Sequence, residues 1–236
     1  MPITPSQLRQ SALFSALPES ALDELSSAAI ERKLTRREVV INKGETLKFF
    51  PLLADGRLQG VDFTLDGREV GLYFVSPDEY FGELSLVDRQ PMAETVIALA
   101  PSVLLMLPRE RTRSLMFSTP EAAEKVALRL TARLRNEVAH RMLLALPNPM
   151  QRLCAQLRSL ARSTTPQASE GACSTQGEVS IAFAPTHQEI AIMINASRET
   201  VTRAFQLLQN QQILQRDGTR LLVLNPAMLE QLAAGG

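Results

Sequence analysis

One uninterrupted helical segment in the middle of the chain constrains the fold more than any other feature of the sequence. Between Thr119 and Leu146 there is no glycine, the single proline falls in the first turn, and apolar residues recur every three or four positions. This spacing predicts a helix about 40 Å long at a rise of about 1.5 Å per residue. The apolar residues are Ala127, Leu130, Leu134, Val138, Met142 and Ala145, with Leu128, Ala132, Ala139 and Leu146 beside them.

This apolar surface is wider than the stripe of a coiled coil. A helix of this kind can pack on its own domain with one side and on a second copy of the chain with the other. We therefore expect a dimerisation helix, and the alternative is a core helix within a single monomer. Pro147-Asn148-Pro149 ends the helix and is the best candidate for a hinge.

Short extended segments separated by turns precede the long helix. Residues 6–32 have the spacing of two short helices separated by Pro18, and Asp-Gly pairs at 55–56 and 66–67 then lie between extended runs. Asp-Gly in this context indicates a hairpin. The regular succession of short strands predicts a compact antiparallel sandwich or roll. The expected strands are 39–41, 51–53, 61–65, 69–75, 95–98 and 102–107.

Behind the long helix, the sequence has the capping residues of two adjacent helices. Thr186 and Glu189 have the spacing of a capping box, and Asn195 tolerates the left-handed backbone of a tight turn. Ser197 can then cap a second helix from Arg198 to about residue 209. The spacing of the buried positions is typical of a helix-turn-helix. Upstream we expect a helix over 150–162 and a surface loop over 163–177, and downstream a hairpin over 213–224 with a basic tip.

The exposed face of the second helix carries groups that can read base pairs. Arginine can donate two hydrogen bonds to guanine, and glutamate can accept one from the cytosine amine. Arg198, Glu199 and Arg203 lie in the N-terminal turns, the part of a recognition helix that reaches base edges. The alternative is an ordinary solvated face. Since Lys+Arg and Asp+Glu are both 25, DNA binding would require a local basic surface.

Three runs of residues resemble the CRP/FNR (catabolite activator protein) family of transcription regulators. The segments 186–190 and 197–203 are similar to its DNA-binding signature, and 80–86 is similar to its cyclic-nucleotide cassette. The resemblance implies an α+β chain with an antiparallel β-roll at 1–118, a dimerisation helix at 119–146 and a winged helix-turn-helix at 147–236. It also implies a cytoplasmic homodimer that binds palindromic double-stranded DNA with TGA-like half-sites and works with RNA polymerase.

The resemblance also assigns individual contacts to DNA. Arg198, Glu199 and Arg203 align with the family's base-reading residues. The phosphate-contacting positions are Thr186, His187, Gln188 and Ser197, and the remaining candidates on the recognition helix are Thr200, Thr202 and Gln206.

The expected effector pocket departs from the family pattern. Relatives that bind cAMP hold its phosphate with an Arg-Ser pair, but Met92 and Ala93 stand at those places and Glu94 follows them. A buried phosphodiester without a cation would lose its hydration uncompensated, so we do not expect control by cAMP in the usual mode. Arg89 is the candidate substitute cation, and a cavity lined by Glu83 and a cation would favour nucleotide binding after all. The candidate pocket residues are Gly82, Glu83, Leu84, Arg89, Met92 and Ala93.

Other cofactors and other classes of protein find little support. Cys154 and Cys173 are too few, and too late in the chain, for an iron–sulfur cluster, and His140 is the only histidine outside the winged helix, so we expect neither haem nor a bound metal. An enzyme of the cupin type is not expected, because its metal site needs several histidines or carboxylates from strands and the only two histidines, His140 and His187, lie on no predicted strand. We also find no catalytic motif, signal peptide or membrane span in the sequence. The remaining alternative is a small-effector signalling module whose DNA binding is secondary.

Overall fold

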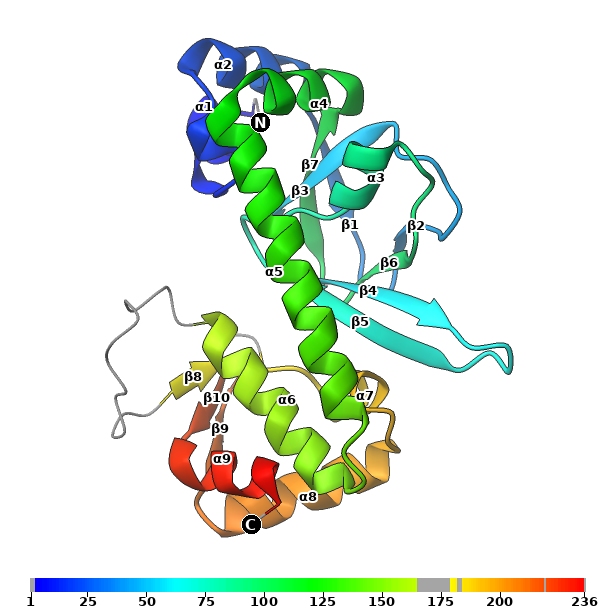
Figure 1. Cartoon of the computed structure of the whole chain (residues 1–236), viewed down its shortest axis with the longest axis vertical. Helices are drawn as coiled ribbons and strands as arrows, with labels where there is room; N and C mark the ends of the chain where they lie inside the picture. Colours follow the sequence, from blue (N-terminus) through cyan, green and yellow to red (C-terminus); the bar gives the residue numbers. More distant parts are fainter. Residues whose placement is uncertain (1–2, 165–178, 182–183, 219, 236) are drawn as a thin grey trace. The chain divides into compact units, whose positions relative to one another are not determined.

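The computed structural model describes residues 3–164, 179–181, 184–218 and 220–235 (Figure 1). The chain forms two compact units, Met1–Arg135 and Asn136–Gly236. The division between them falls within the long helix α5 (Pro120–Leu144), which confirms the helix predicted over 119–146 to within two residues at either end. No helix in the described ranges is long and apolar enough to cross a membrane.

The first unit begins with short helices, as predicted. These are α1 (Pro5–Gln10), the 3-10 turn η1 (Phe14–Ala16) and α2 (Glu19–Ala28). The expectation of helix up to residue 32 is wrong, because β1 (Ile30–Leu34) pairs along its whole length with β7 (Ser102–Pro108). Sheet pairing over long sequence distance outweighs the local helical spacing at these positions.

Two antiparallel sheets form the β-roll. The remaining strands are β2 (Val39–Ile41), β3 (Phe49–Asp55), β4 (Leu58–Phe63), β5 (Glu69–Val75) and β6 (Thr95–Ala98). One sheet has the strand order β1-β7-β3 and the other β2-β6-β4-β5, which confirms the predicted roll. Asp66-Gly67 turns the β4–β5 hairpin as expected. The hairpin predicted at Asp55-Gly56 is wrong, because β3 and β4 belong to different sheets.

Helices cover the roll and complete its core. Apolar side chains between the sheets, Phe81, Val96 and Leu104 among them, form one buried cluster. A second cluster joins the N-terminal helices to β3 and β7 and takes in Ala122 and Val126 of α5, so it fixes the first turns of the long helix on this unit. Two further helices, α3 (Glu83–Asp88) and α4 (Arg109–Ser118), lie in the segments after β5 and β7.

The second unit is a winged helix-turn-helix. After the Pro147-Asn148-Pro149 break come α6 (Pro149–Thr164), β8 (Val179–Ile181), α7 (His187–Met193), α8 (Arg198–Asn210), β9 (Leu214–Asp217), β10 (Arg220–Val223) and α9 (Pro226–Ala234). The sheet order is β8-β10-β9, with β9 and β10 forming the predicted hairpin. Residues 163–164 belong to α6 and not to the expected loop, whose other positions lie outside the described residues.

Candidate DNA-binding and effector sites

The first helix of the helix-turn-helix begins at the predicted capping box. The Thr186 hydroxyl accepts a hydrogen bond from the Glu189 amide at 3.2 Å, and the Glu189 carboxylate accepts one from the Thr186 amide at 3.0 Å. These two bonds satisfy amides that would otherwise lack partners at the helix start. Asn195 then has a φ of 49°, so it supplies the left-handed turn expected of it.

The second helix, α8, is divided cleanly into a buried and an exposed face. The Ser197 hydroxyl caps it by accepting from the Thr200 amide at 3.1 Å. Its buried residues are Val201, Ala204, Phe205 and Leu208. Its candidate DNA-contacting residues lie on the other side, with Arg198, Glu199, Arg203 and Gln206 exposed and Thr200 and Thr202 half-buried.

Glu199 keeps its charge on this face. The hydrogen bond from its own backbone amide lowers the pKa of the Glu199 carboxyl, and the Ser197 hydroxyl lowers it further. The charges of Arg198 and Arg203 act in the same direction. The helix therefore presents an ionised acceptor between two guanidinium donors, the set that can distinguish base edges.

His187 connects the two helices of the motif. Its Nδ1 lies 2.9 Å from the Thr202 hydroxyl, and its ring stacks on Phe205 with the centroids 4.6 Å apart. Burial lowers the pKa of His187, and the positive charges of Arg216 and Arg198 lower it further. The imidazole is therefore mainly neutral at neutral pH.

The surface around α8 adds positive charge and polar donors. Arg216 and Arg220 are exposed on the β9–β10 hairpin, where Arg220 pairs in register with Asp217. In the first turn of α7, Gln188 is exposed. The N-cap residues Thr186 of α7 and Ser197 of α8 are exposed as well. The chain is neutral as a whole, but the helix-turn-helix and its wing gather four exposed arginines.

In the β-roll, the cassette helix α3 starts from a tight left-handed turn. Gly82 has a φ of +80°, which residues with a Cβ rarely adopt, and a Cβ at this position would lie 2.4 Å from Cδ1 of Leu47, so the turn favours glycine. Met92 is buried against this turn, with its sulfur 3.6 Å from the Ser85 hydroxyl and 3.5 Å from the position of a Gly82 Cβ. The Met92 side chain thus fills the place where the cation of the family pattern is expected.

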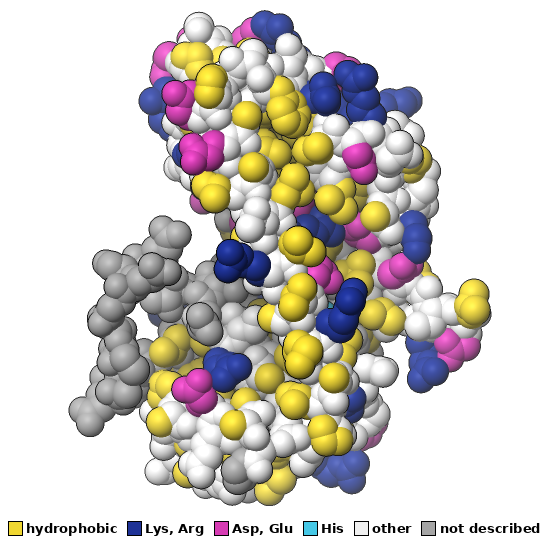
Figure 2. All heavy atoms as spheres, in the orientation of Figure 1, with side chains coloured by type: hydrophobic (Ala, Val, Ile, Leu, Met, Phe, Trp, Pro, Cys, Tyr) yellow, Lys and Arg dark blue, Asp and Glu magenta, His cyan; other side chains and the backbone are white. Residues whose placement is uncertain are grey.

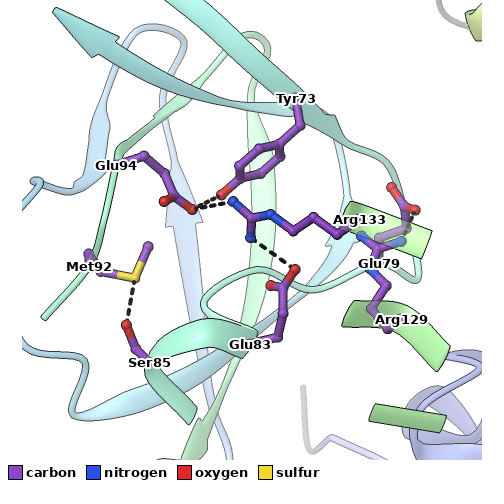
Figure 3. A network of polar contacts seen from close by, with 8 residues as sticks. All are labelled: Tyr73, Glu79, Glu83, Ser85, Met92, Glu94, Arg129 and Arg133. Atoms are coloured by element: carbon purple, nitrogen blue, oxygen red, sulfur yellow. Dashed lines mark hydrogen bonds and ion pairs between the residues drawn. The ribbon is translucent and has the colours of Figure 1, made fainter. Parts of the chain in front are cut away.

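A cation does reach this region, but it comes from α5. Arg133 donates to Glu83 at 2.9 Å and to Glu94 at 3.1 Å, and its guanidinium lies 4.5 Å from the centroid of the Tyr73 ring (Figure 3). The Tyr73 hydroxyl donates to the same Glu94 oxygen at 2.5 Å. We call these four residues, Tyr73, Glu83, Glu94 and Arg133, the Arg133 cluster.

The two carboxylates of the Arg133 cluster are buried and share one half-buried guanidinium. Glu83 and Glu94 are each 3% exposed. Burial would lower the pKa of Arg133, but the charges around it, that of Glu83 first, raise it above its ordinary value, so the side chain stays charged. Burial and then the Glu94 carboxylate raise the pKa of Tyr73 well above 10.0, so its hydroxyl remains a donor.

Two family models match this chain, and together they span most of it. A cyclic nucleotide-binding domain matches residues 31–119, and a Crp-like helix-turn-helix domain matches residues 151–232. The Cyclic AMP receptor protein of Thermus thermophilus is 27% identical over 228 residues, which cover 97% of this chain and 99% of that protein. This chain belongs to the CRP/FNR family.

One further curated relative and two solved structures match this CRP/FNR regulator over nearly their whole length. A CRP-like cAMP-activated global transcriptional regulator of Mycobacterium tuberculosis is 26% identical, covering 96% of this chain and 98% of that one. The structure of FixK2 from Bradyrhizobium japonicum has a TM-score of 0.72 at 22% identity, covering 86% and 96%. A CRP-family transcriptional regulator from Thermus thermophilus has a TM-score of 0.62 at 26% identity, covering 86% and 96%. The chain is thus a DNA-binding transcription regulator of the CRP/FNR type.

The residues predicted for the effector pocket of this CRP/FNR regulator do not all converge. Gly82, Glu83 and Met92 are buried together, whereas Leu84, Arg89 and Ala93 are exposed. Arg89, the expected substitute cation, lies at the C-terminal end of α3 in a left-handed conformation. The sequence did not point to Arg133. Its partners Glu94 and Glu83 lie 39 and 50 positions earlier in the chain, and no short motif links them to it.

The remaining candidates have local roles in the second unit. His140 is half-buried, and its Nε2 lies 2.8 Å from the carbonyl oxygen of Met193 at the end of α7. Cys154 is buried, and burial raises the pKa of its thiol to about 11. Cys173 lies outside the described residues. Among the residues that are described, no group of three or more His, Cys, Asp or Glu side chains could hold a metal ion.

Proposed function

We propose that this CRP/FNR regulator is a homodimer that reads palindromic operators with Arg198, Glu199 and Arg203 and is not controlled by cAMP in the usual mode. The observation that carries the proposal is the exposed face of α8, where these three side chains lie on a capped helix whose other face is buried. Residues at the start of α7, together with Arg216 and Arg220, would contact DNA phosphates. These contacts would fix the register of α8 on the duplex.

The exposed apolar face of α5 supports the dimer. Leu134, Val138 and Met142 follow one another at intervals of four residues and are 66%, 56% and 66% exposed in the single chain. Figure 2 shows hydrophobic side chains gathered along this helix. A row of large apolar side chains in water is costly, and a second α5 would cover it.

The Arg133 cluster supports independence from cAMP. Relatives are named for their response to cAMP, but in this chain Met92 and Ala93 replace the pair expected to hold the phosphate. The cation present, Arg133, already has two carboxylate partners. A cyclic phosphate would therefore enter a cluster that holds two carboxylates and a guanidinium that both carboxylates already contact.

A selection from random double-stranded DNA tests the proposal without assuming a target sequence. We expect the full-length chain to enrich an inverted repeat with half-site centres about 34 Å apart, and to bind it equally well with and without cAMP. Enrichment of unrelated sequences would overturn the reading of DNA by α8. A cAMP-dependent rise in affinity would overturn the proposed independence from the nucleotide. RNA polymerase is the partner that family membership implies for the bound dimer.

A further inference from the structure

The carboxylate of Glu94 is bound by two donors, Arg133 and Tyr73, of the kind that would bind an anionic ligand. One of its oxygens accepts from both the Arg133 guanidinium and the Tyr73 hydroxyl, and the carboxylate is almost completely buried (Figure 3). The Tyr73 ring has room to reach it because the facing residue of β4 is Gly60, where a Cβ would lie 2.5 Å from the ring. Two donors from different elements thus converge on one internal negative charge.

The charge balance shows why this position is closed to a second anion. Glu83 shares the same guanidinium, and its other oxygen, also buried, has no hydrogen-bond partner among the described residues. An incoming phosphate would have to displace Glu94 from Arg133 and leave that carboxylate buried without a cation. An unpaired buried carboxylate is strongly unfavourable, so displacement is disfavoured.

We propose that Glu94 is a built-in anion, which holds Arg133 and Tyr73 in the arrangement that an anionic effector would otherwise have to create. The inference rests on the proposed independence from cAMP and adds its cause. Loss of the Glu94 side chain would vacate a buried position for a small carboxylate or phosphate, with both donors still aimed into it.

The long helix gives this cluster a route to DNA binding. Arg133 lies on α5, and the same helix continues into the second unit, where His140 contacts the last carbonyl of α7. The internal anion fixes α5 to the β-roll from one side, and His140 ties the end of α5 to the helix-turn-helix. Loosening Arg133 should therefore weaken operator binding, although Glu94 is far from α8 in the sequence.

Chemical rescue of Glu94→Ala in the full-length protein tests the proposal. Acetate carries the Cγ carbon and the carboxylate that this substitution removes, so it can rebuild the ion pair. We expect the variant to melt roughly 5 °C below the wild type and to bind the selected operator about tenfold more weakly. Millimolar acetate, and also inorganic phosphate, should restore both properties, whereas neutral acetamide should restore neither.

Two further variants make the result decisive. In Glu94→Ala/Arg133→Met the cation is gone, so acetate should have no effect. Glu94→Gln keeps the volume and removes the charge, so it should bind operator more weakly than the wild type and should not respond to acetate. The Gln variant also covers the case in which Glu94→Ala does not fold.

The proposal is overturned if Glu94→Ala or Glu94→Gln matches the wild type, or if acetate and acetamide act alike. These outcomes are separate from failure of the proposed function. Melting temperatures of the Glu94 variants require neither DNA nor cAMP, whereas operator selection and the effect of cAMP are measured on the wild type.

Discussion

Arg198 and Arg203 on α8 differ from Arg216 and Arg220 on the wing in the part of the duplex that each pair is expected to contact. All four side chains are exposed. The N-terminal turns of a recognition helix meet base edges, where a guanidinium can donate two bonds to one guanine. A hairpin beside that helix meets the phosphate backbone, which is the same in every sequence.

Arg198→Ala should therefore impair specificity, and Arg216→Ala should impair affinity alone. We expect Arg198→Ala to cost about 1–3 kcal/mol of binding free energy and to relax the preference at one base pair of each half-site. Arg216→Ala should weaken all duplexes alike and reduce the salt dependence by about one counterion. Fluorescence anisotropy on single-base variants of the selected operator, at several salt concentrations, measures both. Unchanged preference in Arg198→Ala would remove it from the base-reading set.

The depressed pKa of His187 gives protein stability and DNA affinity opposite pH dependences. Because the folded state resists protonation of His187, its contribution to stability is lost as pH falls from the ordinary pKa of 6.5 towards the lower folded value. A DNA phosphate beside the ring would raise that pKa, so the complex takes up a proton and affinity increases as pH falls.

We expect wild-type affinity for operator to rise between about pH 7.5 and about pH 6, while thermal stability declines as pH falls below about 6.5. His187→Gln should lose most of both trends. Parallel anisotropy and melting curves across this range provide the measurement. Identical pH profiles for the two proteins would rule out a phosphate contact by His187.

At the scale of secondary-structure elements, α5 offers a comparison between two ion-paired arginines one helical turn apart. Arg129 pairs with Glu79 at 3.2 Å, where both side chains are about one-third exposed. Arg133 pairs with Glu83 and Glu94, which are almost fully buried. Exposed pairs contribute little to stability, whereas removal of one partner from a buried pair leaves charge without compensation.

Arg133→Met should therefore destabilise the β-roll far more than Arg129→Met. We expect about 3–5 kcal/mol for the first and less than about 1 kcal/mol for the second. Urea unfolding followed by tyrosine fluorescence compares them, since Tyr73 and Tyr80 both lie in the first unit. Equal losses would mean that the two carboxylates do not depend on Arg133.

At the scale of the whole molecule, the apolar row on α5 predicts the assembly state. Val138 lies in the middle of this row, and Asn136 is exposed about 200° around the helix from it. Val138→Asp would bury a charge in the proposed dimer interface, whereas Asn136→Asp adds the same charge on the other side. We expect the first variant to sediment as a monomer and to lose operator binding, and the second to remain a dimer. A dimeric Val138→Asp would place the interface elsewhere.

Local chemistry determined the features that could be predicted. The capping box at Thr186, the cap at Ser197, the turn at Asn195 and the hairpin at Asp66-Gly67 each depend on bonds between residues a few positions apart. The buried face of α8 follows from its helical period alone. For these reasons the recognition helix and its exposed arginines could be located from the sequence, and the family resemblance assigned their roles.

Tertiary structure decided which side chains share the interior of the β-roll. Arg133 contacts Glu94 and Glu83, which are separated from it by 39 and 50 positions in the sequence. Tyr73 contacts Glu94 over a separation of 21 positions. The separation of β3 and β4 into different sheets is equally non-local. A sequence pattern records the preferences of neighbouring residues. The pairing of a buried charge depends on which distant elements pack together, and only the folded chain brings those elements into contact.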